Sequence, residues 1–305
     1  MADGCLPPAV SRGRLACLTM DCPCCNSTSW YERWPGFMIC GQCGVMTVEQ
    51  SFAADELHKL YGPEYFAGRE YIDYVADKTV QQKTLAGHLR VVRRHEPPGG
   101  RLLEIGCAHG FFLELIQRDY PNPVGIDISE AAVGQARARG LDARAGDLLE
   151  LPLDGSFDAA CLWDTIEHLA RPYEVITRAH ELLKPGGHLF LTTGDFGSLL
   201  ARMQGLRWRQ IHPPTHLFYF TRQSLRALCS RVGLEVVEFR TVTVHRRFGS
   251  ALQALARFHA ATLSGRLASL ALRALPTSLL AWGIPANLGD TMLLVARKNT
   301  SPPPP

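Results

Sequence analysis

The chain of 305 residues is predicted to fold as an α/β domain around a doubly wound parallel sheet. A short apolar run at Leu102–Ile105 has the composition of a buried strand, and the residues from Phe111 onward have that of a helix. Gly106 and Gly110 space the turn between them. A strand, a glycine turn and a helix in this order open a nucleotide-binding α/β unit, in which glycine lets a ligand approach the backbone.

Apolar segments and turn residues place the rest of this domain. Further strands are expected at residues 123–129, 141–147, 157–164, 188–193, 235–244 and 290–297. Helices are expected at residues 80–94, 131–139 and 172–183, the second capped by Ser129 and the third followed by a Lys-Pro-Gly-Gly turn. The fourth strand, at 157–164, is almost entirely apolar, as a parallel strand covered on both faces should be.

Composition narrows the class of protein. The hydrophobic content of 46% is that of a globular chain, and no uninterrupted apolar run is long enough to predict a spanning helix. The first residues lack a basic region followed by an apolar one, so no secretory signal is expected. We therefore expect a protein that is either free in the cytoplasm or peripheral to a membrane.

The cysteines are concentrated near the N-terminus, where seven of the ten precede residue 44. Cys22 with Cys25 and Cys40 with Cys43 form two C-x2-C pairs, each of which can present two thiolates to one ion. This spacing predicts a structural Zn²⁺ site in a zinc-ribbon-like module, with short strands at about residues 30–34 and 37–39. A closed site of four thiolates has no open position for catalysis.

Two questions about this cluster stay open at the level of sequence. Cys24 lies between the first two ligands and is an alternative ligand. A redox-sensitive group of thiols is the competing interpretation of the whole cluster.

Acidic residues follow the second and third predicted strands. Asp127 ends the second strand, 23 residues after Glu104, where a carboxylate can accept hydrogen bonds from a ribose diol. Asp147 and Leu148 come directly after the third strand.

The order of these features resembles the class I S-adenosylmethionine-dependent methyltransferases. Residues 104–110, E-I-G-C-A-H-G, match the first motif of that family, E/D-x-G-x-G-x-G, with Ala108 at the middle glycine. The resemblance covers about residues 60–298 and implies a Rossmann-like, doubly wound sheet of seven strands, the last of them antiparallel. It also implies S-adenosyl-L-methionine as cofactor, bound by Glu104, Gly106, Cys107, Gly110, Asp127, Ile128, Asp147, Leu148 and Trp163.

An NAD(P)-dependent dehydrogenase is the competing class. Its G-x-G-x-x-G turn holds a pyrophosphate at a helix N-terminus, whereas Gly106 here begins G-C-A-H-G. A cationic sulfonium needs no pyrophosphate site and gains from nearby carboxylates such as Glu104, which favours the methyltransferase.

The segment after the fourth strand is the predicted place for acceptor chemistry. His168 is a candidate general base there, because imidazole titrates near neutrality. Asp164, Glu167 and His168 also resemble the E-x-x-E-H segment of ubiquinone-biosynthesis-type O-methyltransferases, which binds a divalent ion in some members. The resemblance implies an Mg²⁺ site at these three residues. The alternative is that Glu167 and His168 only order the loop.

A second histidine cluster follows the fifth strand. His212 and His216 are four residues apart among prolines and aromatics, which suggests the rim of a pocket. The segment resembles one found in methyltransferases of bacterial polysaccharide, lipid and natural-product clusters. His216 is therefore a second candidate for a catalytic base or substrate contact, and a structural histidine is the alternative. Thr221 is expected to cap the helix that follows.

The C-terminal third is rich in arginine. Between residues 196 and 280 only Glu235 and Glu238 are acidic, which favours an anionic substrate, nucleic acid or an anionic membrane surface as partner. The alternative is a solvated basic helix face. The arginines in this segment are Arg202, Arg207, Arg209, Arg222, Arg226, Arg231, Arg240, Arg246, Arg247, Arg257, Arg266 and Arg273.

Leucines recur at helical spacing in an insertion at about residues 245–289. This pattern predicts either an amphipathic element on an anionic membrane or a helical cap on the sheet or a second subunit, and the cap is favoured. The expected division of the chain is a zinc-ribbon-like module at 1–50, a helical lid or linker at 51–97, the methyltransferase domain at 98–300 and a proline-rich tail at 301–305.

The expected function is methyl transfer from S-adenosylmethionine to oxygen or carbon of a small-molecule, lipid-linked or carrier-linked acceptor. An RNA- or protein-directed methyltransferase is one alternative. The other is a zinc-ribbon binding module with a vestigial cofactor site. Nucleic acid is disfavoured as a partner because few aromatics alternate with the arginines. Neither the acceptor nor the oligomeric state follows from the sequence.

Overall fold

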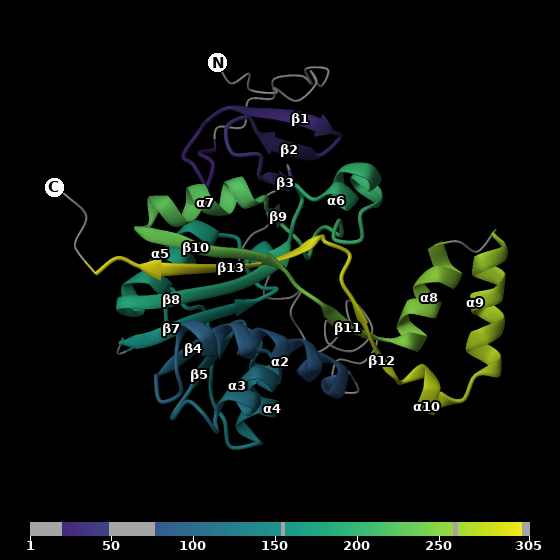
Figure 1. The fold of residues 1–305 in the computed structure, drawn as a ribbon. Helices are drawn as coiled ribbons and strands as arrows, with labels where there is room; N and C mark the ends of the chain where they lie inside the picture. The colour runs from purple at the N-terminus through teal and green to yellow at the C-terminus, as the bar shows by residue number, and fades with distance from the viewer. Residues whose placement is uncertain (1–19, 49–76, 154–155, 259–261, 301–305) are drawn as a thin grey trace, which may run out of the picture.

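A seven-stranded sheet forms the centre of the computed structural model, which describes residues 20–48, 77–153, 156–258 and 262–300 (Figure 1). Its strand order is β10-β13-β8-β7-β4-β5-β6, and β13 runs antiparallel to both neighbours. The predicted doubly wound fold is therefore confirmed. The strands are β4 (Leu102–Ile105), β5 (Val124–Asp127), β6 (Asp142–Ala145), β7 (Phe157–Trp163), β8 (Leu183–Gly194), β10 (Leu234–Thr241) and β13 (Thr291–Lys298).

Helices cover both faces of this sheet because consecutive side chains of a strand point to opposite faces. Leu102 packs with α2, α3 and α4 on one face, while its neighbour Leu103 packs with α5 and α7 on the other. The strand order reverses between β4 and β7, which creates a crevice at their carboxyl ends where such sheets bind ligands. The helices are α2 (Lys78–His95), α3 (Phe111–Ile116), α4 (Glu130–Arg137), α5 (Pro172–Leu182) and α7 (Arg222–Arg231).

Local signals in the sequence fix several of these helix ends. The hydroxyl of Ser129 accepts from Ala132 N at the start of α4, as predicted. Thr221 caps α7 and forms a reciprocal capping box with Ser224. The predicted Lys-Pro-Gly-Gly turn lies inside β8, which begins at Leu183 instead of residue 188. Lys184 Nζ donates to the Asp158 carboxylate of β7 at 2.7 Å, which holds this part of the strand beside β7.

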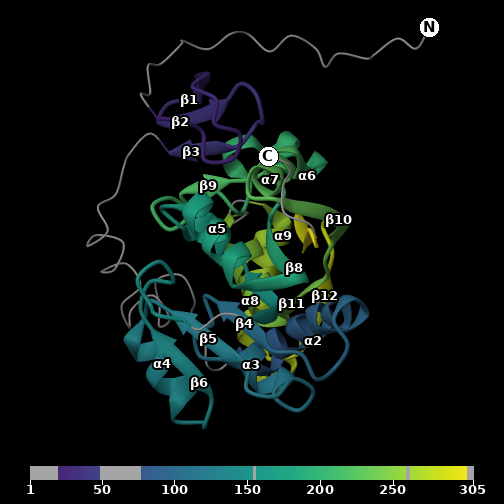
Figure 2. The ribbon, with the colours of Figure 1, turned by 90° about the vertical axis from the view of Figure 1, so that its left-hand side faces the viewer.

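A second, four-stranded sheet carries the cysteine cluster. Its strands β1 (Trp30–Trp34) and β2 (Phe37–Cys40) lie where the sequence predicts them, and β3 (Met46–Val48) follows. The fourth strand, β9 (Phe218–Tyr219), comes from the segment between β8 and α7 and pairs antiparallel with β3. Figure 2 shows β1 to β3 lying above β9 and α7.

Hydrogen bonds from α7 fasten this small sheet to the larger one. Thr221 Oγ1 donates to the carbonyl of Cys43 at 3.1 Å. The guanidinium of Arg231 donates to the carbonyls of Cys22 at 3.3 Å and Pro23 at 2.8 Å, and it lies 4.0 Å from the ring centroid of Tyr173 on α5. The cysteine module is therefore packed into the same hydrophobic core as α5 and α7.

The insertion departs from the expected cap. The strand predicted at 235–244 stops at Thr241, and a short hairpin of β11 (Val244–Arg247) and β12 (Gly283–Ala286) carries the helices α8 (Phe248–Phe258), α9 (Leu263–Ala274) and α10 (Thr277–Leu280). Three leucines of α9 are exposed, so this helix does not pack these leucines on the sheet. The other form of the predicted cap, packing on a second subunit, stays a prediction. Figure 1 shows α8 and α9 standing to one side of the sheet.

The arginine-rich region is less uniform than its composition suggests. Arg209 pairs with Asp290, Arg222 with Asp195 and Arg240 with Glu238, so that part of its positive charge is offset locally. The helix predicted at 80–94 is confirmed as α2. The expectations for residues 1–19, 51–76 and 301–305 lie outside the described residues. Within the described ranges, no helix combines the length and apolar character that crossing a bilayer requires.

Arg231→Ala is expected to lower the free energy of unfolding by about 1.5–3 kcal/mol, because it leaves two carbonyls of the cysteine module without their charged donor. Urea denaturation measures the loss. The matched control is Arg226→Ala on the same helix, whose guanidinium stacks on Phe239 away from the module and is expected to cost about 1 kcal/mol or less. Equal losses in the two variants would contradict this role for Arg231.

Candidate functional site

The turn after β4 requires glycine at its first position. Gly106 has a φ of +78°, and a Cβ built there would lie 2.4 Å from Thr165 Oγ1, well inside contact distance. Gly106 N and Cys107 N both donate to the carbonyl of Ile126, which ties the turn to β5. Gly110 also has a positive φ, +73°. The backbone of this turn thus approaches the end of β7 without an intervening side chain.

Glu104 places a buried carboxyl group with one unsatisfied oxygen at this turn. The side chain is buried, and its Oε2 has no hydrogen-bond partner among the described residues. Burial, and then the nearby carboxylate of Asp127, raise the pKa of Glu104 well above its usual range. A cationic donor such as an ammonium group would supply the missing partner and favour the ionised form.

Asp127 is held rigidly at the tip of β5. Its Oδ2 accepts from Ala108 N at 2.8 Å and its Oδ1 from Ser129 N at 2.9 Å. Each oxygen keeps a second lone pair for a donor such as a ribose hydroxyl. Ala108, where the motif of the family has glycine, adopts a φ of +45° and supplies one of these bonds.

The other predicted cofactor residues line the same carboxyl edge. Asp147 follows β6 and accepts from Arg171 at 3.1 Å, beside buried Leu148. Trp163 ends β7 and stacks on His88 of α2 at 4.7 Å between ring centroids, and its Nε1 has no partner in the described part of the chain. Cys107 is buried in the turn, and Ile128 follows Asp127 half-buried. The residues present therefore fit a cationic nucleoside.

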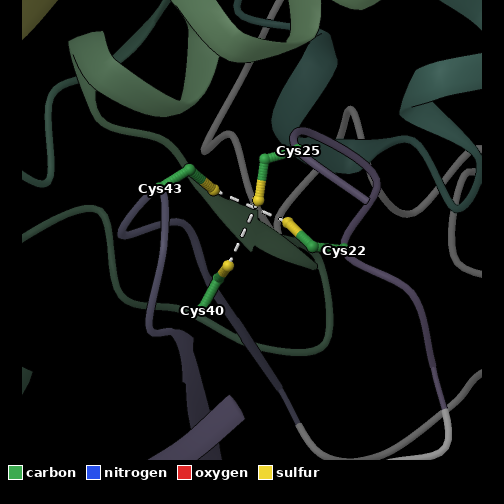
Figure 3. A group of neighbouring side chains, drawn as sticks. All are labelled: Cys22, Cys25, Cys40 and Cys43. Carbon is green, nitrogen blue, oxygen red and sulfur yellow. Dashed lines mark hydrogen bonds between the residues drawn. The ribbon is translucent and has the colours of Figure 1, made fainter. Parts of the chain in front are cut away.

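The four predicted metal ligands converge. The sulfur atoms of Cys22, Cys25, Cys40 and Cys43 lie within 4.8 Å of one another, and two pairs are 3.5 Å apart (Figure 3). Zn–S bonds of about 2.3 Å in a tetrahedron place sulfurs about 3.8 Å apart, which these distances approach. The donor set and its geometry thus fit zinc, and Cys24 is buried outside this set of four.

A second group of potential ligands lies at the end of β7. The short helix η2 (Ile166–His168) brings Glu167 and His168 together with His216, and the ligand atoms of the three lie within 4.8 Å of one another. The rings of His168 and His216 are edge to face with centroids 4.6 Å apart. His216 also contacts His212, at 3.9 Å between ring centroids. The structure thus joins the two histidine segments that the sequence presents separately.

Backbone contacts orient these side chains. His168 Nδ1 lies 2.8 Å from the carbonyl of Thr215, so Nδ1 carries the proton and Nε2 the lone pair. The ring of His216 is likewise hydrogen-bonded to the backbone of Gln210. Glu167 is buried, and its Oε2 has no partner among the described residues. This is the pattern in which a metal-binding histidine donates its other N–H to a carbonyl.

Asp164 does not join this group, contrary to the predicted Mg²⁺ ligand set. Its φ is +47°, and its Oδ1 accepts from the hydroxyl of Thr192 on β8 at 2.9 Å. The backbone N–H of Asp164 donates to the same hydroxyl. The carboxylate is therefore committed to β8, and His216 takes the third place instead.

Burial also changes the expected titration of the histidines. It lowers the pKa of His168 to about 4 and that of His216 well below its usual value. Both rings are therefore neutral at pH 7. A neutral ring suits a hydrogen-bond acceptor or metal ligand better than the near-neutral titration that the sequence suggests.

Comparison with known proteins agrees with this architecture. A family model described as a methyltransferase domain matches residues 76–239, more than half of the chain. The chain belongs to this methyltransferase domain family. The match covers the cofactor turn, β4 to β8, η2 and the histidines.

Curated relatives share part of this methyltransferase domain. A ubiquinone biosynthesis O-methyltransferase of Xanthomonas axonopodis pv. citri is 36% identical over 111 residues, which are 34% of this chain and 46% of the relative. One from Pseudomonas aeruginosa is 32% identical over 103 residues, 31% of this chain and 44% of the relative. The chain thus matches less than half the length of these relatives.

Solved methyltransferases share the fold. The magnesium protoporphyrin IX methyltransferase of Synechocystis, with bound SAH, superposes with a TM-score of 0.51 at 14% identity and covers 81% of this chain and 100% of that one. A SAM-dependent methyltransferase of Thermotoga maritima gives a TM-score of 0.50 at 21% identity, with coverage of 77% and 98%. At these identities the similarity is one of fold.

Some residues of the site are not evident from the sequence. Thr165 contacts the cofactor turn, Thr192 holds Asp164, and His88 stacks on Trp163 from a helix outside the strand pattern. None of these three residues lies in a motif of the family. Ala108 does, because it stands at a glycine position of the first motif. The other three contacts depend on how β7, β8 and α2 pack in the methyltransferase domain.

Gly106→Ala is expected to weaken binding of S-adenosylmethionine by about tenfold or more, because the added methyl collides with Thr165 and fills the turn. Isothermal titration calorimetry measures the affinity. Gly140→Ala is the matched control, since Gly140 has nearly the same φ, +77°, but nothing within 4 Å of its Cβ. It should share the backbone strain and retain affinity. Equal weakening in both variants would contradict a specific role for Gly106.

Proposed function

We propose that this protein transfers a methyl group from S-adenosylmethionine to a hydroxyl oxygen of a small or lipid-linked acceptor. The observation that carries the proposal is the buried group of Glu167, His168 and His216 directly after β7. Thr165, two residues before Glu167, contacts Gly106 of the cofactor turn, so the group lies next to the donor side of the crevice. The partial similarity to O-methyltransferases supports oxygen as the methylated atom.

On the side of the crevice that would bind the methyl donor, here called the donor side, the protein supplies carboxyl groups. Glu104 offers a buried carboxylate to the positive end of the cofactor, and the fixed carboxylate of Asp127 is placed for the ribose. When bound, S-adenosylmethionine supplies an electrophilic methyl group for an in-line displacement. The protein holds the acceptor oxygen on that line, which lowers the entropic part of the barrier.

On the acceptor side, His168 and His216 present neutral imidazoles beside the buried carboxyl group of Glu167, whose pKa is raised to about 8 by burial and by nearby Asp164. Because His168 Nδ1 faces the Thr215 carbonyl, its Nε2 is the atom that accepts a hydrogen bond or a proton from the acceptor hydroxyl. Glu167, His168 and His216 also suit a divalent metal ion, two nitrogens and a carboxylate being a common donor set. Such an ion would favour ionisation of a bound hydroxyl.

His168→Ala and His216→Ala are each expected to reduce turnover by about 10²–10⁴-fold, because the acceptor loses its base or its metal ligand. Turnover is measured by mass spectrometry as the gain of one methyl group by hydroxylated acceptors. Calorimetry should show unchanged affinity for S-adenosylmethionine. His180→Ala, on the outer helix α5, is the control and should leave turnover unchanged.

Metal analysis separates the two roles of the histidines. If an ion binds there, the wild type contains a second metal beside that of the cysteine module, and both histidine variants lose it. Full turnover in His168→Ala and His216→Ala would refute the proposed acceptor site.

We propose that the cysteine module holds one structural zinc ion through Cys22, Cys25, Cys40 and Cys43. Cys40→Ser is expected to remove this zinc and to lower the melting temperature, because a closed site contributes its binding energy to folding. Elemental analysis gives the zinc content. Cys24→Ser is the control and should keep the zinc ion. Loss of zinc from this variant would show that Cys24 is a ligand.

A further inference from the structure

The helix α9 buries its small residues and exposes three of its leucines to solvent. Its small residues Gly265 and Ala268 are buried, whereas Leu263, Leu267 and Leu270 are 74%, 56% and 63% exposed. Spacings of four and three residues place these leucines on one stripe of the helix. A helix that buries glycine and alanine and exposes leucine has its larger apolar surface available to a partner.

Positive charge flanks this stripe. Arg266 and Arg273, seven residues apart, lie along one side of it and are exposed. The whole segment between Glu238 and Asp290 contains six arginines and no acidic residue. Trp282, which is 62% exposed, adds an aromatic side chain of the type that settles at membrane interfaces. The partner of this surface must therefore be both apolar and anionic.

A second copy of the chain fits this surface poorly. A two-fold contact would bring the positive charge of both copies into one interface, and the segment between Glu238 and Asp290 supplies no acidic residue to offset it. An anionic lipid surface offers acyl chains for leucine and phosphates for arginine. We infer that the arm formed by β11, β12 and α8 to α10 docks this protein on an anionic membrane through the leucine stripe of α9.

The place of the arm in the fold agrees with such docking. β10 ends at Thr241 and β13 begins at Thr291, next to the residues that end β8. Trp163, the last residue of β7, pairs with Thr192 at the same edge of the sheet. Figure 1 shows the arm leaving the sheet where β10 ends and β13 begins. By the strand pairing, this is the edge that holds the cofactor turn and the histidines.

Vesicle flotation of the full-length protein tests this inference. Wild type should float with vesicles of phosphatidylcholine mixed with phosphatidylglycerol and much less with phosphatidylcholine alone. Leu263→Glu with Leu267→Glu should weaken binding by about tenfold or more, since two leucines that would be buried among the acyl chains are lost. Arg266→Glu with Arg273→Glu should remove the preference for anionic lipid, and added salt should weaken wild-type binding.

The matched control is Leu199→Glu with Met203→Glu on α6 (Leu199–Gln204), which are 74% and 75% exposed and one helical turn apart. This variant should bind vesicles like the wild type. Circular dichroism and calorimetry with S-adenosylmethionine confirm that each variant is folded, independently of the acceptor chemistry. Wild type that stays with the lipid-free fraction, or equal loss in the α6 control, would overturn the inference. Sedimentation showing a dimer that the leucine variant abolishes would assign the surface to a second copy instead.

Discussion

The backbone of one residue, Leu217, joins the small sheet to the histidine group. Its carbonyl accepts from Thr47 Oγ1 at 3.0 Å, on β3 of the small sheet. Its N–H donates to the carbonyl of Glu167 at 2.8 Å, on η2. His216 is the preceding residue and β9 follows directly. The position of His216 beside Glu167 therefore depends on β9 remaining paired with β3.

This connection gives the cysteine module a purpose beyond its own stability. A closed site of four thiolates has no chemistry to offer an acceptor, but it can stiffen the strand that fixes the histidine loop. Thr221 extends the connection, because it caps α7 and also donates to Cys43. The module thus supports the loop that carries His216, on the side of the crevice that we propose for the acceptor. The donor side is built separately, from β4 and β5.

Charge explains why the cofactor turn favours a cationic ligand. Glu104 and Asp127 repel each other within a buried turn, and the backbone donors of Ala108 and Ser129 satisfy only Asp127. A neutral ligand would leave Glu104 without compensation. A cation resolves the repulsion, so the turn discriminates between ligands by charge.

The sequence predicts what depends on local pattern. The strands of the large sheet, the caps Ser129 and Thr221, and the four thiolates all follow from residues close together in the chain. It does not predict β9, whose two residues become a strand only because β3 lies beside them. The sequence also assigns Asp164 to the metal-binding group, whereas its positive φ directs the carboxylate to Thr192. It does not predict that three leucines of α9 face outward, since periodicity gives a stripe but not its direction.

The pairing of β3 with β9 also has a consequence for biosynthesis. Thr47 and Leu217 are 170 residues apart, so the small sheet is completed only after most of the chain has left the ribosome. Until then β3 is an open edge strand with unpaired backbone groups, which is a template for association with other nascent chains. Early capture of a metal ion by the cysteines would fold this edge into a compact knuckle while the rest of the chain is still being synthesised.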